Sequence, residues 1–344
     1  MTLEVKRSTK ATYTTKEGKL SIAMANELRF EREGALIEGT ATNNNPHSRS
    51  QSNMGRTTHV IYEQVAMGLD THRSTLRAGT YEEQHYLRWW TGAPVGIEIG
   101  KTYTISFFLL IDERDMPLIV PTRGVAGDLL YRKISEGFYR AEFTLTPAEE
   151  FETTYVGINI LKGAVVKDIS ISGFQVETGS AASSYIPTDG TAAVRYTDKV
   201  HFPVDQIPFR DPYTMSMDVI YENRGDYGFI DFFSVIGAGR NLWRLEGTGF
   251  RQFIGAHPVS VYGPGKISST FTVTWNAPRG TQTLYKDGVS VDSQDNVELN
   301  DPATVTGVAL TFSALSNHTK SRHLHVKNIR AWNQVLTPAQ IAAI

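Results

Sequence analysis

Four aromatic residues between positions 81 and 90 are the side chains best suited to bind a ligand. They are Tyr81, Tyr86, Trp89 and Trp90, and the charged and amide residues beside them are Glu82, Glu83, Gln84 and Arg88. Flat aromatic faces bind the C–H side of a sugar ring, and polar groups bind its hydroxyls. Successive strand residues face opposite sides, so one tryptophan can pack while the other contacts a glycan. The alternative is that both belong to the core or to a subunit interface. Trp243 is a further candidate of the same kind.

Pairs of carboxylates suggest a second chemistry, the hydrolysis of a glycosidic bond. This reaction requires two acids about 5 to 10 Å apart. The string Asp112-Glu-Arg-Asp115 contains adjacent acids, and Glu149 is next to Glu150, but both positions are typical of solvated turns and loops. The string Glu-x-Asp-x-x-Glu, which sandwich-fold glucanases carry on one strand face, does not occur in the sequence. We therefore predict that the protein is not an enzyme.

The histidines contain one pattern that could bind a metal ion. His323 and His325 alternate in a strand-like stretch, so both face the same side, and His318 is close in the chain. Three imidazoles can bind zinc or nickel. The alternative, which we favour, is a polar outer face opposite Leu324 and Val326. The sequence has no Asp-x-Asp-x-Asp-Gly calcium loop, and we predict neither a metal nor a cofactor.

The composition argues against several other classes of protein. The 344 residues include no cysteine, which excludes disulfides, thiolate nucleophiles and cysteine-based zinc sites. A net charge of -2 gives no basis for binding nucleic acid or an anionic membrane. Without an apolar run of about 18 residues, we expect no membrane insertion. The N-terminus lacks a hydrophobic signal core, so we expect the chain to stay in a cytoplasm unless lysis or a dedicated route releases it.

Strand patterns dominate the chain and predict an all-β fold. The strand-like stretches are 102–111, 137–145, 155–161, 165–177, 213–221 and 271–275. They are rich in β-branched and aromatic residues and are separated by turns, which predicts antiparallel β-sandwiches or jelly rolls in both halves of the chain. Asp287-Gly288 marks a hairpin turn. One short helix is expected at the C-terminus, with Thr337 as its N-cap and Pro338 as its first residue.

Residues 173–195 predict a joint between the two sandwiches. The two-residue period of the preceding strand changes phase at Gly173, which indicates a β-bulge. Small residues follow, and Pro187 forces the residue before it into an extended conformation. Tyr185 and Ile186 are the sizeable apolar side chains of this linker. We predict that they anchor it against the first sandwich.

Three segments resemble modules of phage virion proteins. The first is made of Arg7–Tyr13, Ala25–Phe30 and Gly34–Glu38. It is similar to a segment that commonly reads Arg-Ala-Ser-Thr-Ala-Thr-Tyr, Asn-Glu-Pro-Arg-Phe and Gly-Leu-Leu-Ile-Glu, and it departs from that pattern at Lys10, at Leu28 and in the polar stretch 42–45. The second, 175–177 with 182–188, resembles the end of a carbohydrate-binding-module-like jelly roll. The third, 284–289 with 329–341, resembles a concanavalin A-like (laminin G-like) sandwich.

The resemblance implies four parts and a place on a virus particle. The parts are an N-terminal docking segment over 1–46, a carbohydrate-binding-module-like sandwich over 47–182, a linker over 183–196 and a concanavalin A-like sandwich over 197–344. The implied protein is assembled in the host cytoplasm and exposed on the virion, as a short tail, collar or head fibre or as a decoration. Its implied partners are other virion proteins, copies of itself in a homotrimer, and host-surface glycans.

Three functions compete under this interpretation. The first is glycan adhesion by multivalent weak binding, which makes a shallow site useful when several copies engage one surface. The second is a purely structural decoration without glycan binding. The third, ranked well behind the others, is a polysaccharide depolymerase.

Overall fold

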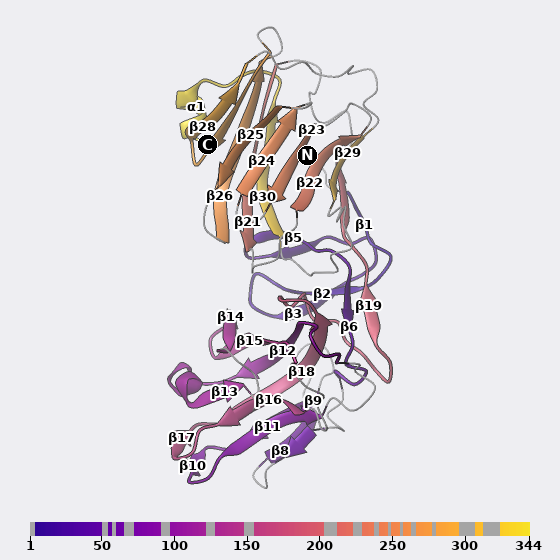
Figure 1. The fold of residues 1–344 in the computed structure, drawn as a ribbon, viewed down its shortest axis with the longest axis vertical. Coiled ribbons are helices and arrows are strands. Elements are labelled where there is room, and N and C mark those ends of the chain that lie inside the picture. The colour runs from indigo at the N-terminus through magenta and orange to yellow at the C-terminus, as the bar shows by residue number, and fades with distance from the viewer. Residues whose placement is uncertain are drawn as a thin grey trace.

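Two β-rich bodies lie along the long axis of the molecule, and strands from the first 43 residues lie between them and within one of them (Figure 1). The structure is a computed structural model of the 344-residue chain. It describes residues 4–49, 54–56, 60–64, 72–90, 97–121, 128–147, 155–202, 212–222, 229–236, 241–246, 249–254, 257–262, 266–276, 280–295, 307–311 and 324–344. No helix in these ranges is long and apolar enough to cross a membrane.

The first sandwich has a four-stranded and a six-stranded antiparallel sheet within the described ranges. The four-stranded sheet is β13 (Ile119–Pro121), β16 (Tyr155–Ile160), β11 (His85–Trp90) and β7 (Met54–Arg56). The six-stranded sheet is β14 (Leu130–Ser135), β15 (Phe138–Leu145), β12 (Tyr103–Leu110), β18 (Ile169–Thr178), β9 (His72–Leu76) and β8 (Val60–Gln64). The strands β10 (Gly79–Tyr81) and β17 (Ala164–Val166) form a separate pair, and the 3-10 helix η2 (Glu113–Leu118) precedes β13.

The core of this sandwich follows from the alternation of its strands. In β12, Ile105, Phe107 and Leu109 are buried between the two sheets, where Phe107 packs against Phe174 with ring centroids 5.0 Å apart. The opposite face of the same strand is covered as well, because Phe108 is also buried. A strand covered on both faces is what its apolar sequence predicts.

The second sandwich has two seven-stranded antiparallel sheets among the described residues. One sheet is β1 (Glu4–Lys6), β20 (Lys199–Phe202), β29 (Gly307–Thr311), β22 (Phe229–Ile236), β23 (Asn241–Glu246), β24 (Gly249–Ile254) and β25 (His257–Tyr262). The other is β28 (Val289–Gln294), β27 (Thr281–Lys286), β26 (Lys266–Asn276), β21 (Tyr213–Glu222), β30 (Leu324–Trp332), β5 (Gly34–Ile37) and β4 (Arg29–Glu31). Their inner faces form one core, in which Phe250 stacks on Phe271.

The N-terminal segment contributes strands to the second sandwich. β1 pairs with β20 at the edge of one sheet, and β5 pairs with β30 in the other. The remaining strands of the segment lie at the joint, where β2 (Ala11–Thr14) and β3 (Leu20–Ala23) form a hairpin and β6 (Ala41–Asn43) pairs with β19 (Ala193–Arg195). A segment too short for a core of its own is therefore integrated into larger sheets.

The predicted all-β class is confirmed, and so are three local features. Gly173 forms the bulge in β18, where the register with β12 shifts, and its φ is +60°. The turn at Asp287-Gly288 joins β27 to β28, and both residues have positive φ. The C-terminal helix α1 (Pro338–Ala342) begins after the N-cap Thr337, which forms a capping box with Gln340.

We predict that Gly173→Ala destabilises the protein more than Gly163→Ala does. Both glycines have positive φ, which costs an L-residue about 1 to 2 kcal/mol. At Gly173 an added Cβ would also lie 2.8 Å from the ring of Phe108, whereas no other group lies within 4 Å of one at Gly163. Over-packing of this kind adds about 1 to 3 kcal/mol. Urea unfolding of both variants measures the difference, and equal losses would contradict the role of Phe108.

Candidate functional site

Tyr81 is part of the core and does not form a sugar platform, contrary to the prediction from the sequence. Its side chain is 5% exposed, and its ring packs edge-on against His85 with centroids 4.5 Å apart. Its hydroxyl donates a hydrogen bond to the carbonyl of Arg77. Burial raises the pKa of this hydroxyl. The ring face that a sugar requires is therefore covered by the protein itself.

Tyr86 and Arg88 lie together on the outer face of the four-stranded sheet. Leu87 between them is fully buried in the core, so residues of the other parity face outward. The guanidinium carbon of Arg88 is 4.2 Å from the centroid of the half-buried Tyr86 ring. Arg88 also donates from Nε and Nη2 to Oδ1 of Asn159, at 2.9 and 2.8 Å. A half-buried aromatic ring and a guanidinium thus lie together, and the carboxamide that holds the guanidinium belongs to the buried Asn159.

For the three predicted tryptophans, the structure describes only the strands to which they belong. Trp89 and Trp90 belong to β11, opposite Val156 and Tyr155 of β16, and Trp243 belongs to β23. Their side chains lie outside the described residues.

Of the two groups of acids that the sequence places in turns, the structure describes Asp112 and Asp115. Asp112 caps η2, and its hydrogen bonds from Arg114 and then Lys167 hold the pKa of its carboxyl well below the ordinary range. Asp115 is buried and accepts the backbone N–H of Lys167 at 2.8 Å. The pair Glu149 and Glu150 lies outside the described residues.

A buried ionic network joins the N-terminal segment to the linker. Arg29 lies at its centre and is fully buried. Its guanidinium pairs with Glu38 at 2.6 Å and with Asp198, and it donates to the hydroxyl of Ser184 at 2.9 Å. Asp198 also pairs with Arg7 at 2.5 Å. Burial lowers the pKa of Arg29, but the two carboxylates outweigh it and the pKa is raised.

A second set of buried polar groups ties the linker to the first sandwich. Glu177 of β18 accepts hydrogen bonds from the N–H and the hydroxyl of Ser183, at 2.8 and 2.6 Å. Gln175 accepts the N–H of Ile186 at 2.6 Å. Asn43 of β6 donates to the carbonyl of Ile186 at 2.7 Å and accepts the N–H of Val176 at 3.1 Å. Three parts of the chain therefore share one hydrogen-bonded cluster.

Tyr185 anchors the linker on the first sandwich, as its sequence context predicts. Its ring lies edge-on to Phe108 with centroids 5.4 Å apart, and its side chain is 2% exposed. The buried guanidinium of Arg140 lies 4.5 Å from the Phe108 ring and 5.5 Å from the Tyr185 ring. Leu20 of the N-terminal hairpin packs against the same cluster. The outer face of the six-stranded sheet is thereby covered.

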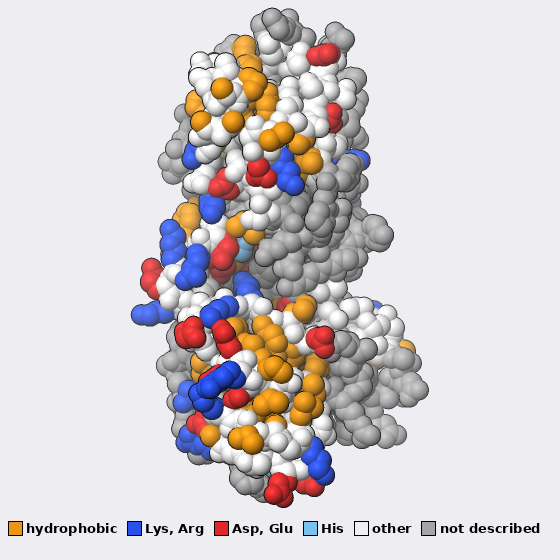
Figure 2. All heavy atoms as spheres, turned by 90° about the vertical axis from the view of Figure 1, so that its left-hand side faces the viewer, with side chains coloured by type: hydrophobic (Ala, Val, Ile, Leu, Met, Phe, Trp, Pro, Cys, Tyr) orange, Lys and Arg blue, Asp and Glu red, His pale blue; other side chains and the backbone are white. Residues whose placement is uncertain are grey.

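A cavity of about 410 Å³ lies between the two bodies. Its lining comes from β14 and β15 of the first sandwich, from the linker, from the N-terminal segment and from β21 and β30 of the second sandwich. The charged residues that line it are Glu31, Arg32, Glu33, Arg132, Lys133, Arg140, Glu142 and His325. Figure 2 shows acidic and basic side chains gathered at the waist between the bodies.

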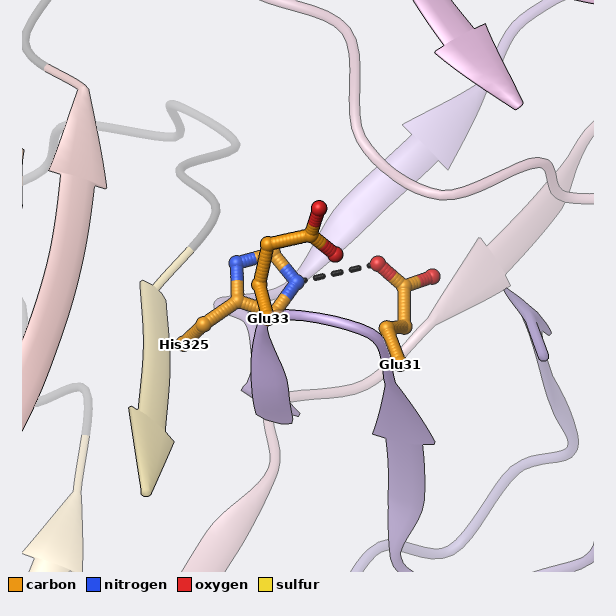
Figure 3. Close-up of side chains that lie close together, drawn as sticks. All are labelled: Glu31, Glu33 and His325. Carbon is orange, nitrogen blue, oxygen red and sulfur yellow. Dashed lines mark hydrogen bonds and ion pairs between the residues drawn. The ribbon is translucent and has the colours of Figure 1, made fainter. Parts of the chain in front are cut away.

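His325 lies in this cavity wall and does not form a polar outer face, contrary to the interpretation that we favoured. It is 6% exposed, and its Nε2 is 2.9 Å from Oε2 of Glu31 (Figure 3). On the face opposite Leu324 and Val326, its cross-strand neighbours Leu36 of β5 and Arg29 of β4 are buried as well. His318 and His323 lie outside the described residues. No local pattern could have paired His325 with Glu31, since they are 294 positions apart.

Comparisons with known proteins reveal no family. No family model matches the chain, and no curated protein is similar to it in sequence. Among solved structures, it is similar to the receptor-binding domain of botulinum neurotoxin C/D mosaic serotype, at 11% identity and a TM-score of 0.31 over 43% of this chain and 40% of that one. A ligand-binding domain of botulinum neurotoxin serotype D, in complex with N-acetylneuraminic acid, matches at 10% identity and a TM-score of 0.33 over 42% and 38%.

The chain spans about two fifths of the length of these structures. At such TM-scores and identities, the likeness carries no inference about what this protein binds.

We predict that Arg29→Met destabilises the protein by about 3 to 5 kcal/mol, because it leaves Glu38 and Asp198 buried without their central cation. The matched control is Arg77→Met, which breaks an ion pair with Asp168 that is half exposed. Exposed pairs of this kind contribute less than about 1 kcal/mol. Chemical unfolding followed by tryptophan fluorescence compares the two. Similar midpoints for both variants would show that the buried network does not hold the joint.

We also predict that the stabilising effect of Glu31 depends on pH. Burial raises its pKa, but the hydrogen bond to His325, the charges of Arg132 and His325 and the N–H of Thr14 outweigh it and lower the pKa from 4.5 to about 2. The stability that ionised Glu31 contributes is therefore present above pH 4.5 and is lost as the pH falls toward 2.

The melting temperatures of the wild type and Glu31→Gln should accordingly differ most above pH 4.5 and converge between pH 4.5 and 2. Glu82→Gln, which changes an exposed turn residue, should follow the wild type throughout. A constant difference across this range would contradict the prediction.

Proposed function

We propose that this protein is a structural component of the surface of a phage particle, where it holds two β-sandwiches in a fixed relation and presents one of them to host-surface glycans. The supporting observation is that the residues that carry the resemblance are the residues of the buried joint. Arg7, Arg29 and Glu38 come from the first resembling segment. Gln175 and Glu177 come from the second.

This coincidence gives the resemblance a physical basis. The motifs are distant in sequence, yet their side chains form one network, for example where the N–H of Ser184 donates to Glu38 at 2.8 Å. Buried ionic groups without partners are strongly destabilising, so these residue types must occur together. A protein with the joint of this family is proposed to share its architecture and its place on a virion.

The glycan contact is proposed on the outer face of the four-stranded sheet. Tyr86 and Arg88 combine there an aromatic ring with a guanidinium, which the buried Asn159 orients. Trp90 belongs to the same strand and has the sequence parity of Tyr86 and Arg88, and we include it in the proposed contact on that ground. A shallow site of this type binds weakly, and display in several copies, as in the homotrimer that the resemblance implies, would raise its avidity.

A glycan array with the wild type, Tyr86→Ala and Trp90→Ala tests this proposal. We expect a signal that falls about fivefold in both variants, because stacking on an aromatic side chain contributes on the order of 1 kcal/mol. The control is Tyr196→Ala, which removes an exposed aromatic residue outside the sheet.

The purely structural role would be favoured if no glycan gave a signal and if particles assembled only when the protein was present. Release of reducing ends from host capsule would instead favour a depolymerase and overturn the proposal that the protein is not an enzyme.

A further inference from the structure

We propose that Glu31, Glu33 and His325 form a binding site for one divalent transition-metal ion, with zinc the best match. Their ligand atoms all lie within 4.8 Å of one another, and Figure 3 shows the three side chains converging. An imidazole nitrogen with two carboxylates suits zinc and its neighbours, whereas calcium and magnesium prefer oxygen ligands alone. The proposal is independent of the role on a particle.

The backbone brings these three residues close together without a bound ion. Glu31 pairs with Gly34 at the end of the β4–β5 hairpin, so Glu33 lies in the connecting turn. His325 is opposite Leu36 on the other side of β5. Gly34 has φ of +134°, and an added Cβ would lie 2.6 Å from the carbonyl oxygen of Val326. The hairpin therefore approaches β30 closely, which fixes the spacing of the ligands.

The hydrogen bonding of Glu31 suits a metal ligand. The N–H of Thr14 donates to Oε1 at 2.7 Å, which orients the group and leaves Oε2 facing Nε2 of His325 at 2.9 Å. Ligands at about 2.0 to 2.2 Å from a tetrahedral ion lie about 3.3 Å apart. The ion would thus replace the hydrogen bond between them after a shift of a few tenths of an ångström.

The cavity provides room for the remaining coordination position. Three protein ligands leave one position of tetrahedral zinc for water or for an oxygen of a ligand. Glu31, Glu33 and His325 all line the cavity, so this fourth position opens into it.

Four positively charged residues among those described line the same cavity and oppose a cation: Arg32, Arg132, Lys133 and Arg140. Among them, Arg132 is the one that pairs with Glu31. Its Nη1 is 3.7 Å from Oε2 of Glu31, and its side chain is 42% exposed. The guanidinium can therefore move toward solvent when an ion binds, at a cost in affinity. Removing it should strengthen metal binding, an effect that a purely structural Glu31–His325 pair would not produce.

Equilibrium dialysis of the full chain against zinc chloride, with the bound metal quantified, tests the site. We expect about one ion per chain in the wild type, at least about tenfold weaker binding in Glu33→Gln and His325→Asn, and tighter binding in Arg132→Ala. Glu82→Gln is the control, since it removes an exposed glutamate from another turn. Glu33 and Arg132 are not core residues, so their variants test the site even if His325→Asn fails to fold.

Two outcomes would overturn the proposal. One is the absence of zinc binding by the wild type at micromolar concentrations. The other is equal binding by the wild type, Glu33→Gln and Arg132→Ala, which would place the ion elsewhere among the nine histidines of the chain.

Discussion

The buried charges at the joint are the constraint on which the rest of the structure depends. Arg7, Arg29 and Arg195 are almost fully enclosed together with Glu38 and Asp198. Removing an ion from water costs several kcal/mol, which is recovered only where its partners are well placed. Because the partners come from the N-terminal segment and from the stretch after the linker, the network forms in one arrangement of the chain. Arg195 remains the least satisfied member, since its closest carboxylate oxygen, on Glu38, is 3.6 Å away.

The joint also determines which surfaces remain available. The outer face of the six-stranded sheet carries Phe108 and Phe138, and the linker and the N-terminal hairpin cover it. The linker also lines the cavity between the bodies. The packing that covers the six-stranded sheet therefore also forms part of the cavity wall.

Structural features set by neighbouring residues were predictable from the sequence, and the pairing of distant strands was not. The bulge at Gly173 and the cap at Thr337 depend on residues within a few positions, so their patterns carry the signal. Tyr81 follows the aromatic pattern but is buried, because the strand pair β10–β17 lies against the core. Glu31 and His325 meet only through two further strands added to the sheet. No periodicity indicates which distant edge a short strand will join.

The pairing of Ile37 with Leu324 means that a sheet is completed by residues from nearly opposite ends of the chain. During synthesis the strands β4 and β5 leave the ribosome long before β30 exists. They stay without their sheet until the last strand is made, and closing so large a loop is slow. The second sandwich is therefore not a unit that could be separated at the linker. Division there would leave one fragment with unpaired strand edges and the other with an unfinished sheet.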